Sequence, residues 1–351
     1  MGGNVVLGDN AAERIDLKKI SRSEIVPILY DSLKKINAAF NKQTGFPMWS
    51  EEVLKNRSFL SGSAFHFFDL EKIKDISFTA VKPSVGDIDT QINIMHAPFV
   101  KKWLEDNQSE TFGDLTLIGY KTSADQYITL WSSEKYQFNV QIDLEQVPFD
   151  EDGNPTTWAQ FSHSSSWEDI VQGVKGVAHK YLLRAMNAKD LKEVLIRTKT
   201  GKEKVMTTSE LAFSTSGLRT KLDAITVNGK QEYKDGLPVF REMPTSETGF
   251  ETDLDVIFIA YFGHAPSKDE KQLMWSFTGL LELIRNHFDQ STKIKIADGF
   301  MNTLWGKGAQ TLYRDDPEKD LNEKTEMANV MVRELNLNIK RWSNLIAEFY
   351  Q

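Results

Sequence analysis

Two segments of the chain alternate between apolar and polar residues, which constrains each to a strand with one face toward a core. Residues 86–95 place Ile88, Ile92 and Ile94 opposite Asp87, Asp89, Gln91 and Asn93. Residues 136–147 place Phe138, Val140, Ile142 and Leu144 opposite Asn139, Gln141, Asp143 and Glu145. Because side chains alternate between the two faces of a strand, both segments are predicted to be sheet strands with one polar face.

The polar faces of these segments carry carboxylates that we expect to share cations. Asp87 and Asp89 lie two residues apart, so their charges repel one another on the same side of a strand. Asp143 would join them if the two strands are neighbours in one sheet. Three carboxylates could hold two divalent ions that activate an attacking hydroxyl and neutralise a leaving pyrophosphate. Mg²⁺ suits such a site because it takes oxygen ligands and shares them with phosphates, and Mn²⁺ is expected to substitute for it.

Upstream, Gly62 and Ser63 open a short apolar segment that is typical of a helix start or a buried turn. A helix start offers backbone N–H groups to a phosphate, and Ser63 adds a hydroxyl. A single Asp-x-Asp pair would most simply be a solvated strand face or a turn. The order of the three motifs favours metal-dependent chemistry on a phosphate instead.

Composition narrows the class of protein. The net charge of -8 argues against a surface given over to nucleic acid, although it allows one local basic groove. The chain has no cysteine, which excludes disulfides and thiolate metal sites. Its six histidines form no HxH or HExxH pair, and this spacing argues against a zinc hydrolase. We find no apolar run of about 18 residues and no signal peptide, so a protein without a membrane partner is expected.

The pattern as a whole predicts an α+β fold, with a small mixed or antiparallel sheet flanked by helices and a mostly helical C-terminal region with a β-hairpin. The helices are expected at 22–40, 97–107, 167–187, 253–262, 268–288 and 320–349, further strands at 115–120 and 126–131, and the hairpin at 193–215. We divide the chain into three parts. Residues 1–47 form an N-terminal arm and helix, and residues 48–187 form a domain with the acidic strands. Residues 188–351 form a C-terminal domain, which its position assigns to acceptor recognition.

The order of the motifs resembles the polymerase β-type nucleotidyltransferase superfamily, which has a Gly-Ser helix start, a strand with two alternating aspartates and a later strand with one. This sequence gives Leu60-Ser61-Gly62-Ser63, Gly86-Asp87-Ile88-Asp89-Thr90 and Gln141-Ile142-Asp143-Leu144. The run from Ile142 to Pro148 is also similar to the third-carboxylate strand of archaeal tRNA CCA-adding enzymes. The runs Gly2–Val5 and Lys82–Asp87 resemble nucleotidyltransferases encoded by tailed bacteriophages. The long interval between Ser63 and Asp87 implies an insertion near Asp69 to Ser77.

The resemblance implies a nucleotidyltransferase fold for residues 48–187 and roles for single residues. Asp87 and Asp89 would bind both metal ions, while Asp143 would bind the catalytic metal and orient the acceptor hydroxyl. Gly62 and Ser63 would cradle the β- and γ-phosphates. Glu145 shares a face with Asp143 and could replace it as third ligand, but Asp143 aligns with the single aspartate of the family.

Cations near these motifs are further candidates for nucleotide binding. Lys82 lies five residues before Asp87 and could pair with the triphosphate. On the helix after Trp167, Lys175 and His179 share a face and Lys180 lies beside them. A solvated basic face and a structural histidine are the plainer interpretations. The charged hairpin between Lys189 and Lys204 could touch a phosphate backbone or be no more than a charged hairpin.

These features predict a Mg²⁺-dependent nucleotidyltransferase that moves a nucleoside monophosphate from an NTP, such as ATP, to an acceptor hydroxyl and releases pyrophosphate. The acceptor we expect first is the 3′ end of an RNA, with tRNA as one candidate. Nucleotidylation of a protein or small molecule is the alternative, and a catalytically silent interaction protein on the same fold is the third interpretation. The expected location is the cytoplasm, which would be that of the host if a phage encodes the chain.

Overall fold

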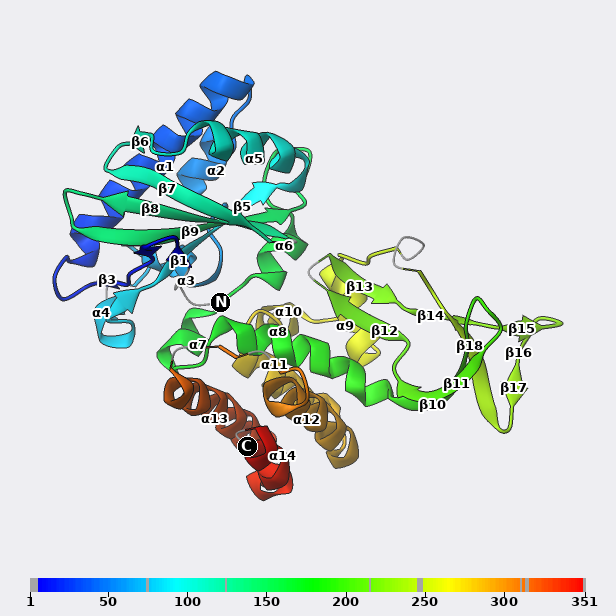
Figure 1. The fold of residues 1–351 in the computed structure, drawn as a ribbon. Helices are drawn as coiled ribbons and strands as arrows, with labels where there is room; N and C mark the ends of the chain where they lie inside the picture. Colours follow the sequence, from blue (N-terminus) through cyan, green and yellow to red (C-terminus); the bar gives the residue numbers. More distant parts are fainter. Residues whose placement is uncertain are drawn as a thin grey trace. The chain divides into compact units, whose positions relative to one another are not determined.

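The computed structural model describes residues 6–73, 76–123, 125–214, 216–244, 249–309, 311–312 and 316–349. The chain divides into two compact units, each visible in Figure 1. The first holds the described residues up to Gly176 with Leu312 and Asp316, and the second holds those from Val177 to Thr311 and from Pro317 onward. The predicted domain boundaries after residues 47 and 187 stay predictions. Among the described residues, no helix combines the length and apolar character that a membrane crossing requires.

The first unit is built on a five-stranded mixed sheet in the order β5-β9-β8-β7-β6. Its strands are β5 (Asp87–Asn93), β6 (Thr111–Phe112), β7 (Leu115–Thr122), β8 (Gln126–Ser133) and β9 (Phe138–Val147). β5 runs parallel to β9, whereas β9, β8, β7 and β6 pair antiparallel. The predicted mixed α/β character is confirmed, and the two alternating segments of the sequence lie side by side in this sheet.

Helices cover the apolar face of the sheet. α1 (Arg22–Thr44) and α5 (Ala97–Asp106) lie together on one side of it (Figure 1). α1 begins where the Ser21 N–H donates to Glu24 Oε2 at 3.1 Å, and it ends at Gly45, whose φ of 87° closes the last turn. It buries a stripe of side chains at helical spacing, Ile25, Leu29, Leu33, Ile36 and Phe40, in one core with Ile88, Ile142 and Leu117.

Short elements complete the first unit. They are β1 (Val6–Leu7), β2 (Asn10–Ala11), β3 (Ile15–Asp16), α2 (Glu51–Asn56), α3 (Gly62–Phe67), α4 (Phe78–Val81), β4 (Ser84–Val85), η1 (Ile94–His96), α6 (Thr157–Ser162) and α7 (Trp167–Val171). Residues 1–5 of the expected N-terminal arm and residues 74–75 of the expected insertion lie outside the described residues. The predicted strand 86–95 stops at Asn93, because the Asn93 side chain accepts the Met95 N–H and turns the chain into η1.

The single helix predicted over residues 167–187 is wrong. The chain forms α7 and then α8 (Gly176–Ala185), followed by η2 (Met186–Asp190). Gly173 lies between the two helices with a φ of 78°, a left-handed conformation that breaks a right-handed helix.

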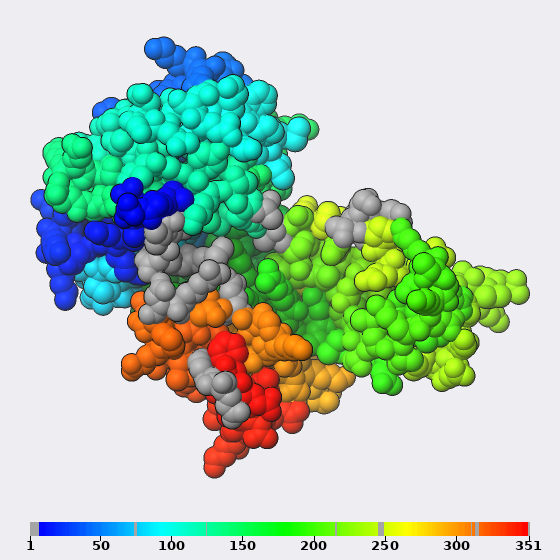
Figure 2. Space-filling view, in the orientation of Figure 1, coloured from blue at the N-terminus to red at the C-terminus, as the bar shows by residue number. Residues whose placement is uncertain are grey.

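The second unit combines a sheet with a helical C-terminal region. The predicted hairpin forms as β10 (Lys192–Arg197) and β11 (Glu203–Thr208). It belongs to a sheet ordered β11-β10-β18-β14, with β17 paired to β18, which the sequence did not predict. The other strands are β12 (Leu211–Ser214), β13 (Gly217–Thr220), β14 (Leu222–Ala224), β15 (Thr226–Val227), β16 (Lys230–Gln231), β17 (Tyr233–Lys234) and β18 (Leu237–Glu242). The β15–β16 hairpin projects from the edge of this unit (Figure 2).

After α8 and η2, the described residues of the second unit form more helices than predicted. They are α9 (Leu254–Phe262), α10 (Lys268–Leu273), α11 (Phe277–His287), α12 (Gln290–Trp305), α13 (Pro317–Glu334), η4 (Ile339–Trp342) and α14 (Ser343–Phe349). The helix predicted over 268–288 divides in two, because the Ser276 hydroxyl accepts the Gly279 N–H and caps a new helix. The segment predicted as one helix over 320–349 likewise divides into α13, η4 and α14.

Candidate metal centre

Three aspartates meet where β5 and β9 pair. The parallel register sets Asp89 opposite Asp143 and Asp87 opposite Gln141, so that all three carboxylates face the same side of the sheet. One ligand oxygen from each of Asp87, Asp89 and Asp143 lies within 4.8 Å of the others. The structure therefore brings together the three residues that the sequence marked as metal ligands, in a group that could hold a metal ion.

Burial makes this group of charges costly without a cation. Asp143 is 3% exposed, and its side chain accepts a hydrogen bond from Gln141 Nε2 at 2.8 Å. Burial, followed by the Asp87 charge, raises the pKa of Asp143 to about 8. Burial and then Asp87 also raise the pKa of Asp89 well above its ordinary value, with Glu145 and Asp143 adding to the effect. A bound proton or a bound cation relieves this repulsion.

Glu145 lies on the same face but is held by other partners. Its Oε2 accepts a hydrogen bond from Ser61 Oγ at 2.7 Å, and its Oε1 lies 3.7 Å from His163 Nε2. Among the described residues, the acidic group within 4.8 Å contains Asp143 and not Glu145. This geometry favours Asp143 as the third ligand, the choice that the family pattern also favoured.

Gly62 lies directly against the acidic pair. The segment before α3 runs along β5, where the Ser61 N–H donates to the Asp89 carbonyl at 3.1 Å. Gly62 has a φ of 56°, and a Cβ added to it would lie 2.7 Å from Asp89 Oδ2. The position therefore requires glycine for both its backbone conformation and its close contact. The Gly62 N–H donates to the His163 carbonyl at 3.0 Å, so its predicted contact with a phosphate stays a prediction.

Lys82 links the serine of this segment to the aspartates. Its Nζ donates to Ser63 Oγ at 2.6 Å. Burial lowers the pKa of Lys82, while the charges of Asp87 and Asp89 act in the opposite direction. The charge of Lys175 lowers the same pKa by a smaller amount. Gly62 thus lies against the acidic group, Ser63 is hydrogen-bonded to Lys82, and nucleotide binding by these residues and by Lys175 stays a prediction.

His179 and Lys180 belong to α8 in the second unit. His179 is 1% exposed, and its Nε2–H donates to the Met274 carbonyl at 2.7 Å. Burial lowers the pKa of His179 to about 4, so the imidazole is neutral at pH 7. These contacts fit the structural interpretation of His179, and nucleotide binding by His179 and Lys180 stays a prediction.

The predicted site residues do not include three residues that hold the carboxylates of this face in place. Gln141 orients Asp143, while Ser61 and His163 hold Glu145. Ser61 and Gln141 lie within the motifs Leu60–Ser63 and Gln141–Leu144, so their positions could have suggested such roles. His163 lies outside every motif. Its role becomes visible only in the structure, where the C-terminal end of α6 places it beside Glu145 of β9.

No protein-family model matches the chain, and no curated protein is similar enough to count as a match.

Proposed function

We propose that this protein is a metal-dependent nucleotidyltransferase that moves a nucleoside monophosphate from an NTP to an acceptor hydroxyl. The observation that carries the proposal is the meeting of Asp87, Asp89 and Asp143 on neighbouring parallel strands, with Gly62 packed against Asp89. The order of these motifs along the chain supports a polymerase β-type nucleotidyltransferase fold for the first unit. The raised pKa values of Asp89 and Asp143 support a role as cation ligands, because a divalent ion would compensate their buried charges.

In the proposed reaction, the acceptor oxygen forms a bond to the α-phosphorus, pyrophosphate leaves with the electron pair of the broken P–O bond, and the hydroxyl proton passes to water. Two Mg²⁺ ions would activate the hydroxyl and neutralise the pyrophosphate. Asp87 and Asp89 would hold both ions, and Asp143 would hold the ion nearest the acceptor. Lys82, which is hydrogen-bonded to Ser63, would compensate negative charge on the triphosphate. The protein supplies no nucleophile of its own.

An RNA 3′ end is the first acceptor to test. The basic hairpin that favoured RNA has several of its cations engaged within the protein. Arg197 donates to Glu203 and Glu232, and Lys192 pairs with Glu210. A protein or small-molecule acceptor is therefore a necessary arm of the same experiment.

The test incubates the full-length protein with Mg²⁺, each α-labelled NTP in turn, and either total RNA or cell lysate. Label in RNA supports the first acceptor, and label in protein or in a small molecule supports the alternative. We expect Asp87→Asn and Asp143→Asn to lower the rate at least about 100-fold, as the loss of transition-state charge stabilisation does elsewhere. Asp31→Asn is the matched control, because this carboxylate is 56% exposed on α1. A wild-type protein that labels nothing would refute the enzyme and leave the silent interaction protein. Variants as active as wild type would refute the roles assigned to the aspartates.

A further inference from the structure

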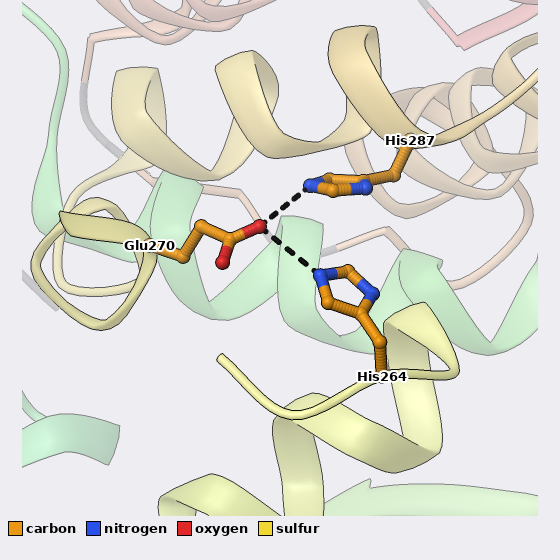
Figure 3. Close-up of side chains that lie close together, drawn as sticks. All are labelled: His264, Glu270 and His287. Carbon is orange, nitrogen blue, oxygen red and sulfur yellow. Dashed lines mark hydrogen bonds and ion pairs between the residues drawn. The ribbon is translucent and has the colours of Figure 1, made fainter. Parts of the chain in front are cut away.

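Two histidines and a glutamate converge in the second unit, apart from the residues of the proposed reaction. His264 follows α9, Glu270 lies in α10, and His287 is the last residue of α11. Figure 3 shows the three side chains pointing toward one another. Glu270 Oε1 lies 3.1 Å from His264 Nε2 and 2.9 Å from His287 Nε2. One ligand atom from each residue lies within 4.8 Å of the others.

Hydrogen bonds outside the cluster fix which atoms face its centre. His264 Nδ1–H donates to the Phe262 carbonyl at 3.3 Å, so in the neutral ring the lone pair is on Nε2, facing Glu270. The Ser267 N–H donates to Glu270 Oε2 at 2.8 Å in the capping box of α10, which leaves Oε1 turned toward both imidazoles. Bonds of this kind, from the far side of a ligand to the backbone, orient the ligands of metal sites.

Ring packing holds the imidazoles in place. The centroids of His264 and His287 are 4.7 Å apart. Phe262 lies 5.5 Å from the His287 centroid, and Phe258 meets His264 edge to face at 5.2 Å. The side chains remain partly open to solvent, with exposed fractions of 41% for His264, 27% for His287 and 20% for Glu270. An ion could therefore enter from solvent and find ligands that are already oriented.

The chemistry of the cluster favours a cation at its centre. With neutral imidazoles, the lone pair of His264 Nε2 is directed at a carboxylate oxygen, which is repulsive unless a proton or a metal ion lies between them. Glu270 Oε1 lies nearest both imidazoles, while its Oε2 accepts the Ser267 N–H, so a single carboxylate oxygen is presented to an ion. Two imidazole nitrogens and one carboxylate oxygen form a known zinc ligand set, in which water takes the fourth position.

The distances are close to those that a zinc ion requires. Zinc bonds of about 2.0–2.2 Å in a tetrahedral arrangement separate neighbouring ligand atoms by about 3.4 Å. The observed separations of 3.1 and 2.9 Å would need to widen by only a few tenths of an ångström. We propose that His264, Glu270 and His287 bind one Zn²⁺ ion, with water as the fourth ligand.

The test uses full-length protein freed of metal with a chelator and then titrated with Zn²⁺ in a calorimeter, with excess Mg²⁺ present to occupy the acidic group. We expect one Zn²⁺ per chain. His287→Gln should weaken binding at least about 100-fold, more than loss of an outer-shell partner does. Glu270→Gln should also weaken it at least about 10-fold, while glutamine at this position can still accept the Ser267 N–H and preserve the cap.

Two control variants isolate the site. Glu282→Gln removes a carboxylate that is 45% exposed on the same helix as His287, and Asp87→Asn alters the acidic group of the first unit. Both should bind Zn²⁺ as wild type does. Co²⁺ provides a second measurement, because a tetrahedral site gives it a strong visible absorption that His287→Gln should abolish.

The possible outcomes separate clearly. Absence of stoichiometric Zn²⁺ binding by wild type, including the case in which the imidazoles form only proton-dependent ion pairs with Glu270, overturns the proposal. Undiminished binding by both His287→Gln and Glu270→Gln overturns it as well. Unfolding curves of the metal-free variants show whether each is folded, and Glu270→Gln retains a valid test if His287→Gln is not. Nucleotidyl transfer is not measured, so failure here leaves the proposed function untouched.

Discussion

The raised pKa of Asp143 makes the stability of the protein depend on pH. This pKa of about 8 lies above the value of 3.8 expected for an exposed aspartate, because of burial and the Asp87 charge. The folded protein therefore binds more protons than the unfolded chain between those two values. Its stability must fall as the pH rises through this window, since the slope follows the difference in bound protons.

We therefore expect Asp143→Asn to stabilise the metal-free protein at pH 8 by more than about 1 kcal/mol. A pKa shift of a single unit already corresponds to about 1.4 kcal/mol. The advantage should shrink toward pH 4, where the wild-type carboxyl is protonated. Mg²⁺ should stabilise wild type more at pH 8 than at pH 5 and have little effect on the variant. Urea unfolding with EDTA or Mg²⁺ measures these differences. A variant less stable than wild type at pH 8 without metal would contradict the account.

Gly62 allows a second test at a single residue. Gly62→Ala should destabilise the protein by about 1–2 kcal/mol, because alanine is strained at a φ of 56°. The added Cβ would lie only 2.7 Å from Asp89 Oδ2, so the carboxylate must move away, which should weaken Mg²⁺ binding.

Gly153→Ala is the matched control for this substitution. Gly153 has a φ of 77°, but nothing lies within 4 Å of an added Cβ. It should show the backbone penalty and keep wild-type affinity for Mg²⁺, as measured by calorimetry. Equal loss of Mg²⁺ affinity in both variants would mean that contact with Asp89 is not what matters at Gly62.

Among the elements, α13 buries an ion pair within one helix. Lys324 Nζ lies 3.0 Å from Asp320 Oδ2, one turn away, and the two side chains are 0% and 3% exposed. The ammonium also lies 4.1 Å from the centroid of the Phe349 ring. Such a pair tolerates the loss of one partner poorly, because a buried charge would be left uncompensated.

Asp320→Ala should therefore cost about 3–5 kcal/mol of the free energy of unfolding, and adding Lys324→Met should recover part of it. α1 offers the comparison, because Asp31 and Lys35 have the same spacing but are 56% and 55% exposed. Asp31→Ala should change stability by no more than about 0.5 kcal/mol. Chemical denaturation measures both, and similar losses in the two helices would contradict the role assigned to burial.

Several elements could be predicted and others could not, for identifiable reasons. β5 and β9 alternate with a period of two and carry large apolar residues, so their pattern was clear. β15, β16 and β17 are two residues long and mostly exposed, which leaves no alternation to detect. The break between α7 and α8 depends on Gly173 taking a left-handed conformation, a choice that glycine allows but does not require.

In the whole molecule, each unit has buried side chains of its own. The core that includes Ile88 and Ile142 lies entirely in the first unit, and the cluster of Val194, Ile196, Leu222 and Phe240 lies in the second. The two candidate metal groups follow the same division, with the aspartates in the first unit and the histidines in the second.

Amide hydrogen exchange should therefore show that Mg²⁺ and Zn²⁺ bind at different sites. Mg²⁺ should slow amide exchange in β5 and β9, and Zn²⁺ should slow it in α9 to α11, because a bound ligand reduces local opening. Asp87→Asn should remove only the first effect and His287→Gln only the second. Mass spectrometry of peptides resolves these segments. Protection of the same peptides by both ions would argue that they share one site.

Local pattern was sufficient to place Asp87, Asp89 and Asp143 on the polar faces of strands, because the period of side chains along a strand depends on neighbouring residues alone. The parallel pairing that sets Asp89 beside Asp143, the contact of Gly62 with Asp89, and the meeting of His264, Glu270 and His287 came from the folded chain. Each of these depends on segments distant in sequence, whose pairing is determined by long-range packing and leaves no periodic trace in the residues themselves.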